Sequence, residues 1–328
     1  MTPAIELNLV TKTFGSKLAV DRLDLAIPTG SVYGFIGPNG AGKTTTIRMI
    51  MSIIFPDSGR VHVLGKDSAV ESKDRIGYLP EERGVYRKMK VGAFLNFMGR
   101  LKGLDGAGLD RKVREFLARV GLAEVYRKKC EELSKGMQQK VQFIAAVLHE
   151  PDLIILDEPF SGLDPVNRRL LRQLIEEQRA AGRTIIFSTH AMFEAEQLCT
   201  HLFMIHRGRK VLDMPMAEVW RRHDPRTILV EPLAPDRARD DRPWSSLRGI
   251  AAARPAASGI ELSLADGADV ADIMQEAARL MPLRRMELKR ANLEEIFIGL
   301  VGGDAAALRA EHDDDQPART SAQSGGDA

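Results

Sequence analysis

The chain reads Val32-Tyr33-Gly34-Phe35-Ile36-Gly37-Pro38-Asn39-Gly40-Ala41-Gly42-Lys43-Thr44-Thr45. The first five residues are mostly apolar and predict a buried strand, and the residues from Thr45 to Ile54 predict a helix. The glycines between them allow the positive φ angles that let successive backbone N–H groups point into one concave loop. The stretch therefore predicts a strand, a glycine-rich loop and a helix, which is a local unit of an α/β fold.

This loop matches the P-loop pattern Gly-x-x-x-x-Gly-Lys-Ser/Thr, which binds the phosphates of a nucleotide. We expect residues 37–45 to surround the phosphates. Lys43 would reach the β- and γ-phosphates as a point charge, and the Thr44 hydroxyl would bind Mg²⁺. Such a set of residues at fixed spacing arises by chance in roughly one such chain per thousand. An ordinary glycine-rich turn is therefore a poor explanation.

A second helix start lies downstream at Leu133-Ser134-Lys135-Gly136-Met137, which we call the signature segment. It precedes a helix predicted over Gln138–Leu148. The start of a helix offers free N–H groups and a positive dipole end, and both suit phosphates. One nucleotide does not obviously need two such sites on one chain. The economical interpretation is a two-fold dimer in which each chain closes the site of the other.

Two adjacent carboxylates, Asp157 and Glu158, follow a predicted buried strand at Leu153–Leu156. Open α/β sheets bind their ligands at the carboxyl ends of such strands. Because neighbouring residues of a strand point to opposite sides, we expect different roles. Asp157 would belong to the Mg²⁺ shell, and Glu158 would orient and deprotonate the attacking water. A third strand, from Thr184, ends at His190, for which a γ-phosphate contact is a better interpretation than a surface cap.

These motifs together resemble those of one family, the ATP-binding-cassette (ABC) ATPases, in both order and spacing. They are the P-loop, the signature segment, Asp157-Glu158, Ser161–Asp164 and His190. The resemblance covers roughly residues 5–215 and implies a P-loop NTPase fold with a helical subdomain.

The resemblance also implies roles for single residues. Phe14 would stack on adenine, with ordinary packing as the alternative. Ser134 and Gly136 would contact the γ-phosphate bound by the partner chain. Asp164 would reach across the dimer interface, and His190 would hold the γ-phosphate and the attacking water.

The sequence departs from the family pattern at two places. The usual signature is Leu-Ser-Gly-Gly-Gln, and this chain has Lys135 and Met137 at its third and fifth positions. The family also has a Gln between its two catalytic subdomains, where this chain has Glu81. A carboxylate can still ligate Mg²⁺ or water, so Glu81 is a candidate for catalysis and for metal binding, although it adds a negative charge near the phosphates.

Two further segments, Gly77–Tyr86 and Leu293–Phe297, resemble the ATPase subunits of type-2 ABC exporters, particularly sodium-efflux and drug- or antibiotic-export subunits. This resemblance implies an ATP hydrolase that uses ATP and Mg²⁺. Its expected partners are a separate multi-span permease and a second ATPase subunit, either a copy of this chain or a related one. The expected location is peripheral, on the cytoplasmic side of the cell membrane.

The composition agrees with this class of protein. The chain has 328 residues, enough for two domains, and its net charge of +2 gives no indication of nucleic-acid binding. Cys130 and Cys199 lack metal or redox spacing, so we expect reduced thiols. The sequence shows no signal-peptide pattern and no apolar run near the roughly 18–20 residues that cross a bilayer. If the chain serves a transporter, the pore must belong to another polypeptide.

We expect three pieces along the chain. Residues 1–222 would form the nucleotide-binding domain, a parallel core with an antiparallel edge at each end, including a helical subdomain at about 85–150. Residues 223–301 would form a small α+β accessory domain. Residues 302–328 would be a disordered tail, with Asp313–Asp315 as solvated charges. The predicted elements are helices at Val91–Leu101, Leu109–Val120, Val270–Leu280 and Leu293–Val301, and strands at Thr227–Val230, Ile260–Leu264 and Arg284–Leu288.

Three functions remain open from the sequence. The first is the ATPase subunit of an exporter, with Tyr86, Met89, Phe94, Phe97 and Met98 either lining a permease-docking groove or simply forming core. The second is a non-transport ABC ATPase acting on ribosomes or DNA, although translation-type members carry two cassettes and DNA-repair types insert long heptad-patterned arms. The third is a nucleotide-dependent binding module without hydrolysis, which an intact Glu158 argues against.

Overall fold

The computed structural model describes residues 3–82, 84–224, 226–234, 243–256 and 259–302. The chain forms two compact units. The first runs to Asp213 and resumes at Glu294, and the second is Met214–Leu293. The predicted boundary at residue 222 lies after α7 (Met216–Arg222), which groups with the second unit, and the predicted boundary at residue 301 lies after the last helix, which groups with the first unit from Glu294.

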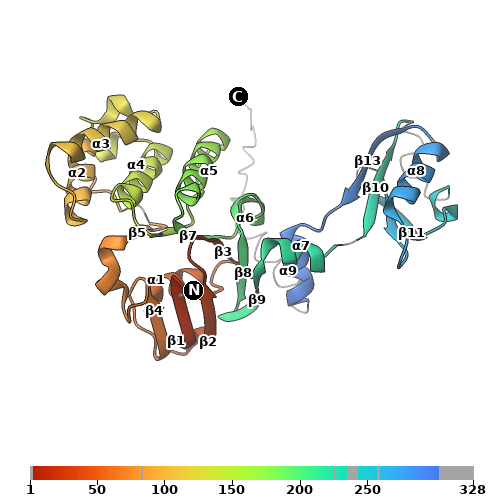
Figure 1. The fold of residues 1–328 in the computed structure, drawn as a ribbon, viewed down its shortest axis with the longest axis horizontal. Helices are drawn as coiled ribbons and strands as arrows, with labels where there is room; N and C mark the ends of the chain where they lie inside the picture. Colours follow the sequence, from red (N-terminus) through yellow and green to blue (C-terminus); the bar gives the residue numbers. More distant parts are fainter. Residues whose placement is uncertain (1–2, 83, 225, 235–242, 257–258, 303–328) are drawn as a thin grey trace, which may run out of the picture. The chain divides into compact units, whose positions relative to one another are not determined.

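The first unit is built on a six-stranded sheet whose order is β5-β6-β7-β3-β8-β9 (Figure 1). Its strands are β5 (Ile76–Leu79), β6 (Leu153–Asp157), β7 (Thr184–Thr189), β3 (Val32–Ile36), β8 (His201–His206) and β9 (Arg209–Pro215). The pairs from β5 to β8 are parallel. Every residue of β3, β6 and β7 is buried, as the apolar runs predict for strands covered on both faces.

The first strands of the chain form a separate sheet rather than the predicted edge of the parallel sheet. Its order is β2-β1-β4, with β1 (Ile5–Phe14), β2 (Lys17–Ile27) and β4 (Ser58–Val63) pairing antiparallel. With α1 (Lys43–Ile50) it covers one face of the parallel sheet through a shared core that includes Leu7, Ile47 and Phe35. The reason for the difference is that these strands join the parallel sheet by packing face to face, not by edge hydrogen bonds.

Helices cover the opposite face of the parallel sheet (Figure 1). They are α4 (Lys135–Val147), α5 (Pro165–Ala180) and α6 (Met192–Leu198), with α2 (Val91–Leu101) and α3 (Gly106–Arg119) beside α4. The bounds of α2 are those predicted. By contrast, α4 begins three residues earlier than predicted, because the Ser134 side chain accepts a hydrogen bond from the Met137 N–H and caps the first turn.

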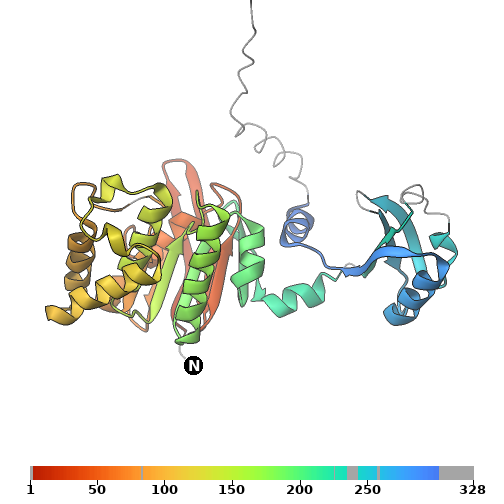
Figure 2. The same ribbon diagram turned by 90° about the horizontal axis from the view of Figure 1, so that it is seen from above.

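The second unit is a small antiparallel sheet, ordered β11-β12-β10-β13, with α8 (Val270–Leu280) packed into its core (Figure 2). The strands are β10 (Thr227–Pro232), β11 (Ile250–Ala256), β12 (Gly259–Leu264) and β13 (Leu283–Lys289). Trp244 is fully buried in this core. The strand β11 was not predicted, because its alanines and proline give no clear alternation.

The last helix, α9 (Leu293–Val301), has the predicted bounds but packs with the first unit from Glu294 onward. The Phe297 ring lies 5.9 Å from the His206 ring of β8. The predicted tail lies outside the described residues, except for Gly302. Within the part of the chain that the structure describes, every helix is too short or too polar to span a membrane.

Gly77 lies where β5 passes under α4, and this contact predicts an effect on stability. A Cβ at Gly77 would lie 2.1 Å from the backbone oxygen of Ala146. We expect Gly77→Ala to lower the free energy of unfolding by about 1–3 kcal/mol, as overpacking does. Gly108→Ala is the matched control, because nothing lies within 4 Å of its added Cβ in α3. Urea denaturation should find this control unchanged or stabilised by roughly 1 kcal/mol; equal stability of the two variants would contradict the packing of α4 on β5.

Candidate functional site

The P-loop follows β3 and wraps the start of α1. Gly40 and Gly42 have φ angles of 74° and 114°, and a Cβ at Gly42 would lie 2.7 Å from the Ala19 carbonyl oxygen. Glycine is therefore required at residue 42 by both conformation and space. The Lys43 ammonium is buried and donates to the carbonyl oxygens of Gly37 (2.6 Å) and Pro38 (3.2 Å). These bonds hold the positive charge over the mouth of the loop.

Asp157 lies beside the P-loop at the end of β6. Its Oδ1 is 3.4 Å from the Thr44 hydroxyl and accepts a 2.5 Å hydrogen bond from the Ser188 hydroxyl. Its Oδ2 is buried and has no hydrogen-bond partner. Burial raises the pKa of Asp157, and the negative charges of Glu81 and Glu158 raise it further. A divalent cation would satisfy the unpaired oxygen, so Asp157 and Thr44 fit the predicted Mg²⁺ site.

The described residues contain no group of three His, Cys, Asp or Glu side chains that could hold a metal.

Glu158 occupies a different position from the one that strand alternation predicts. It lies just beyond β6 with a φ of 48°, so the rule that adjacent strand residues point apart does not apply. Its N–H donates to the Ser188 hydroxyl at 3.0 Å. Its Oε1 lies 3.8 Å from the Lys43 ammonium and 3.0 Å from His190 Nδ1. Both carboxylates therefore serve the same site, at the mouth of the P-loop.

His190 completes this group from the tip of β7. Its side chain is 53% exposed, so the ring can meet a ligand as well as Glu158. The hydrogen bond with Glu158 raises the pKa of His190, although partial burial opposes the shift. Burial lowers the pKa of Lys43, and the nearby carboxylates of Glu158, Asp157 and Glu81 oppose that shift. Glu81 is exposed, and its negative charge acts on Lys43, Asp157 and His190.

The predicted dimer residues form a second group. Ser134 is exposed and caps α4, and Asp164 caps α5 by accepting from the Asn167 N–H at 2.9 Å. The two caps are neighbours, because a Cβ at Gly136 would lie 3.3 Å from Asn167 Nδ2 and 3.5 Å from Leu163 Cδ2. The two helix starts that the sequence singles out therefore share one surface.

Phe14 lies at the end of β1 and is 49% exposed, with the Lys12 ammonium 5.5 Å from its ring centre. A half-exposed ring of this kind can stack on a base. The adenine contact stays a prediction.

Sequence reasoning missed two positioning residues. Ser188 joins Asp157 to the backbone of Glu158. The presence of a polar serine in an otherwise apolar strand could have indicated this role from the sequence. Gln139 is buried in α4 and donates to the Pro159 carbonyl oxygen at 3.1 Å, which links the signature helix to the segment after Glu158. Buried polar side chains normally have such partners.

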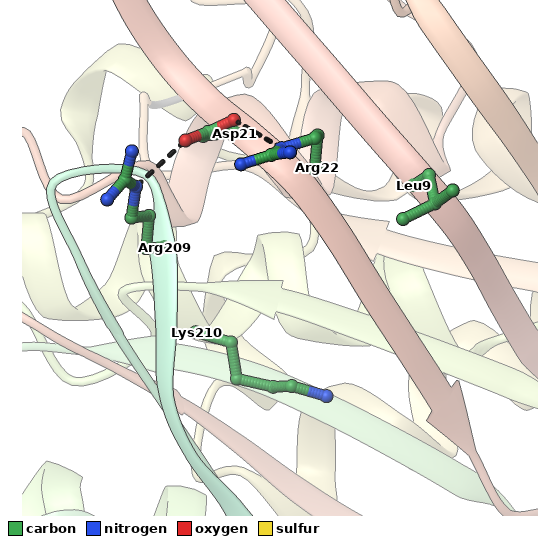
Figure 3. A pocket seen from close by; sticks show the side chains of 5 residues that line it. All are labelled: Leu9, Asp21, Arg22, Arg209 and Lys210. Carbon is green, nitrogen blue, oxygen red and sulfur yellow. Dashed lines mark hydrogen bonds and ion pairs between the residues drawn. The ribbon is translucent and has the colours of Figure 1, made fainter.

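A hollow of about 380 Å³ lies elsewhere in the first unit, lined by Leu9, Asp21, Arg22, Arg209 and Lys210 (Figure 3). Asp21 pairs with Arg209 at 2.8 Å and with Arg22 at 3.4 Å. The charges of both arginines are thus paired with a carboxylate of the protein itself.

The P-loop, the metal-binding fit and the convergence of Glu158 and His190 define a nucleotide phosphate site of the P-loop NTPase class. Comparison with known proteins narrows the family to which this chain belongs. The family model described as ABC transporter matches residues 20–161, and a model for an AAA domain (putative AbiEii toxin, Type IV TA system) matches residues 129–195.

Similar proteins extend over most of the chain. The uncharacterized ABC transporter ATP-binding protein YhaQ of Bacillus subtilis is 40% identical over 303 residues, which is 91% of this chain and 98% of YhaQ. The Nod factor export ATP-binding protein I of Cupriavidus metallidurans is 36% identical, over 65% of this chain and 71% of its own length. The linearmycin resistance ATP-binding protein LnrL of Bacillus subtilis is 34% identical, over 62% and 66%.

A solved structure of the ATP binding subunit of an ABC transporter superposes with a TM-score of 0.62 at 29% identity, covering 67% of this chain and 92% of that one. The chain belongs to the ABC transporter ATP-binding protein family. It is the ATP-binding subunit of an ABC transporter and an ATP hydrolase.

The contact between Glu158 and His190 predicts a change in titration. His190 keeps its proton to higher pH than an ordinary histidine because Glu158 stabilises the charged ring. Glu158→Gln should therefore lower the pKa of His190 toward its ordinary value. The measurement is an NMR titration of the histidine rings in the full chain.

His149 is the internal control for this titration. Burial lowers the pKa of His149 to about 4, and its Nε2 lies 3.1 Å from the Ile76 carbonyl oxygen. Its titration should not respond to Glu158→Gln. A His190 pKa that stays raised in the variant would rule out the contact as the cause.

Proposed function

We propose that this chain is the ATP-hydrolysing subunit of an ABC exporter, which dimerises around two ATP–Mg and drives a separate membrane permease. The observation that carries the hydrolytic part is the position of the Glu158 carboxylate, within reach of both Lys43 and His190. The export part is supported by relatives whose names state Nod factor export and linearmycin resistance. The predicted location, peripheral on the cytoplasmic side of the membrane, follows from this proposal.

The residues would divide the chemistry as follows. Lys43 would exchange the carbonyl oxygens of Gly37 and Pro38 for phosphate oxygens, so that its charge offsets the charge of the triphosphate. Glu158 would accept a proton from the attacking water, since its buried carboxylate is held by its neighbours in one orientation. His190 would donate to the γ-phosphate with the ring nitrogen that does not face Glu158.

Bound Mg²⁺ would supply positive charge to the phosphate oxygens. Thr44 and Asp157 would hold it, and Glu81 would approach the same region. The negative charge of Glu81 would repel the phosphates. Nucleotide binding would therefore depend more strongly on Mg²⁺. The Ser188 hydroxyl holds the Asp157 carboxylate and the backbone of Glu158 together, because it bonds to both.

A second copy of the chain would complete each site. The start of α4 is exposed at Ser134, and α4 is long enough to direct a helix dipole at a ligand. Val166, next to the Asp164 cap that neighbours this start, is 78% exposed.

The permease would dock on the helical subdomain. Tyr86 and Phe97 are exposed, and their rings meet edge to face at 5.9 Å. Phe94, which the sequence also placed among the candidates, is 2% exposed and supports Tyr86 from beneath at 6.0 Å. The docking surface would therefore consist of Tyr86 and Phe97 with the half-buried Met89 and Met98, and Phe94 belongs to the core.

The first test is Glu158→Gln in the full chain. The variant keeps its shape but cannot accept a proton, so ATP binding should persist while phosphate release falls by about 10²–10⁴-fold. An ATP-bound dimer should then accumulate in light scattering with ATP and Mg²⁺. Lys43→Ala is the contrasting variant and should lose ATP binding. Hydrolysis at the wild-type rate in Glu158→Gln would remove the general-base assignment.

The second test concerns the sharing of sites between chains. Ser134→Arg places a bulky cation at the start of α4 and should block the site of the partner chain. A mixed dimer of one such chain and one Glu158→Gln chain should trap no ATP, because the Glu158→Gln site is the one that Ser134→Arg blocks and the other site keeps Glu158 and hydrolyses its ATP. Ser246→Arg, at an exposed serine of the second unit, is the control, and its mixed dimer with Glu158→Gln should trap one ATP. One trapped ATP in the Ser134→Arg mixed dimer would contradict the shared-site arrangement.

A further inference from the structure

A nearly buried carboxylate, Glu194, lies in α6 four residues after His190. Only 2% of Glu194 is exposed. Two arginines of α5 face it: Arg168 Nη1 is 3.9 Å from Oε1, and Arg172 Nε is 3.4 Å from Oε2. The arginines are one helical turn apart and so lie on the same face of α5. Glu194 therefore ties the helix after His190 to the helix after Asp164.

Arg168 makes a second contact that extends this tie. Its Nε donates to the Leu163 carbonyl oxygen at 2.9 Å. Leu163 directly precedes Asp164, whose side chain caps α5. A planar guanidinium meets the carbonyl and the carboxylate with donors on separate nitrogens, whereas a lysine carries all its donors on one nitrogen. A connected path thus runs from the Asp164 cap through Arg168 and Glu194 to the helix that follows His190.

Stability alone does not explain a carboxylate at residue 194. Buried ion pairs are often no more stabilising than apolar side chains of the same size. The buried neighbours of Glu194 on α6 include Ala195 and Leu198, so the surroundings would accept an apolar residue. Glu194 Oε2 and Arg172 Nε are both buried without a hydrogen-bond partner, so this pair is held by charge and not by a directed bond.

We propose that Glu194 is a positioning residue for ATP hydrolysis. Through Arg168 it holds the Leu163 carbonyl, and with it the Asp164 cap, at a set distance from His190. Movement of the loop at residues 161–164 is then transmitted to the ring that contacts Glu158. This inference rests on the proposed function, because that proposal assigns His190 to the γ-phosphate and Asp164 to the partner chain.

The test uses Glu194→Gln in the full chain, which removes the charge and keeps the shape. The turnover number for ATP should fall roughly ten-fold, since small misplacements of catalytic groups cost up to about 10²-fold. The KM for ATP should stay within about two-fold, because the P-loop contacts are unchanged. Glu176→Gln is the control: Glu176 lies on α5, the helix that carries Arg168 and Arg172, and forms an exposed pair with Arg179 at 3.0 Å. Its turnover should equal that of the wild type.

A double-mutant cycle separates positioning from a local folding effect. If Glu194 acts through Arg168, the double variant Glu194→Gln with Arg168→Gln should be no slower than the slower single variant. Losses that multiply, or a full turnover number in Glu194→Gln, would overturn the proposal. Should Glu194→Gln fail to fold, Arg168→Lys decides: it keeps the charge that faces Glu194, and its turnover should still fall because a lysine lacks the separate Nε and Nη1 that contact the Leu163 carbonyl and Glu194. Wild-type turnover in that variant would also overturn the proposal.

Glu158→Gln in the same assay keeps the two proposals apart. If hydrolysis persists in Glu158→Gln, the proposed function fails. If Glu158→Gln is inactive and Glu194→Gln is fully active, only the positioning role fails.

Discussion

The arrangement of three parallel strands, β6, β7 and β3, as direct neighbours is the constraint on which the site depends. Their carboxyl ends meet at one edge, so the P-loop, Asp157 with Glu158, and His190 are brought together although they lie far apart along the chain. Strands buried on both faces leave little freedom to shift register, because any slip would exchange the residues that face the two covering layers. The site inherits this rigidity.

Charged side chains gather at this edge of the parallel sheet, and water screens their charges poorly because the side chains are buried. Lys43, Asp157 and Glu158 are all buried, and the protein compensates them only in part: Asp157 Oδ2 has no partner, and Lys43 bonds to backbone carbonyls. Buried polar groups that lack partners are costly, and they are stabilised when a matching ligand arrives. A triphosphate with Mg²⁺ carries the charges that this set lacks.

Much of the fold and of the site follows from local pattern. The strands β3, β6 and β7 were evident from apolar runs, and α2, α8 and α9 have their predicted bounds, because hydrophobic periodicity and caps act over a few residues. Other features depended on contacts that no local pattern carries. Alternation failed at Glu158 because a positive φ places it beyond the strand, and the partner of α9 is set by packing on His206. Phe94 proved to be core because its ring lies beneath Tyr86.

The sequence by itself determined the chemistry: a glycine loop that can hold phosphates, a lysine and a hydroxyl for them, and carboxylates at the ends of buried strands. Those properties reside in residue types and short spacings. Only the tertiary structure decided which groups touch. It joined Ser188 to both carboxylates, set Gly136 against Leu163 and Asn167, and faced Glu194 with two arginines of another helix. These contacts depend on the packing of α4, α5 and α6 on the sheet. That packing results from many weak apolar contacts over the whole first unit, so no single segment of the sequence predicts it.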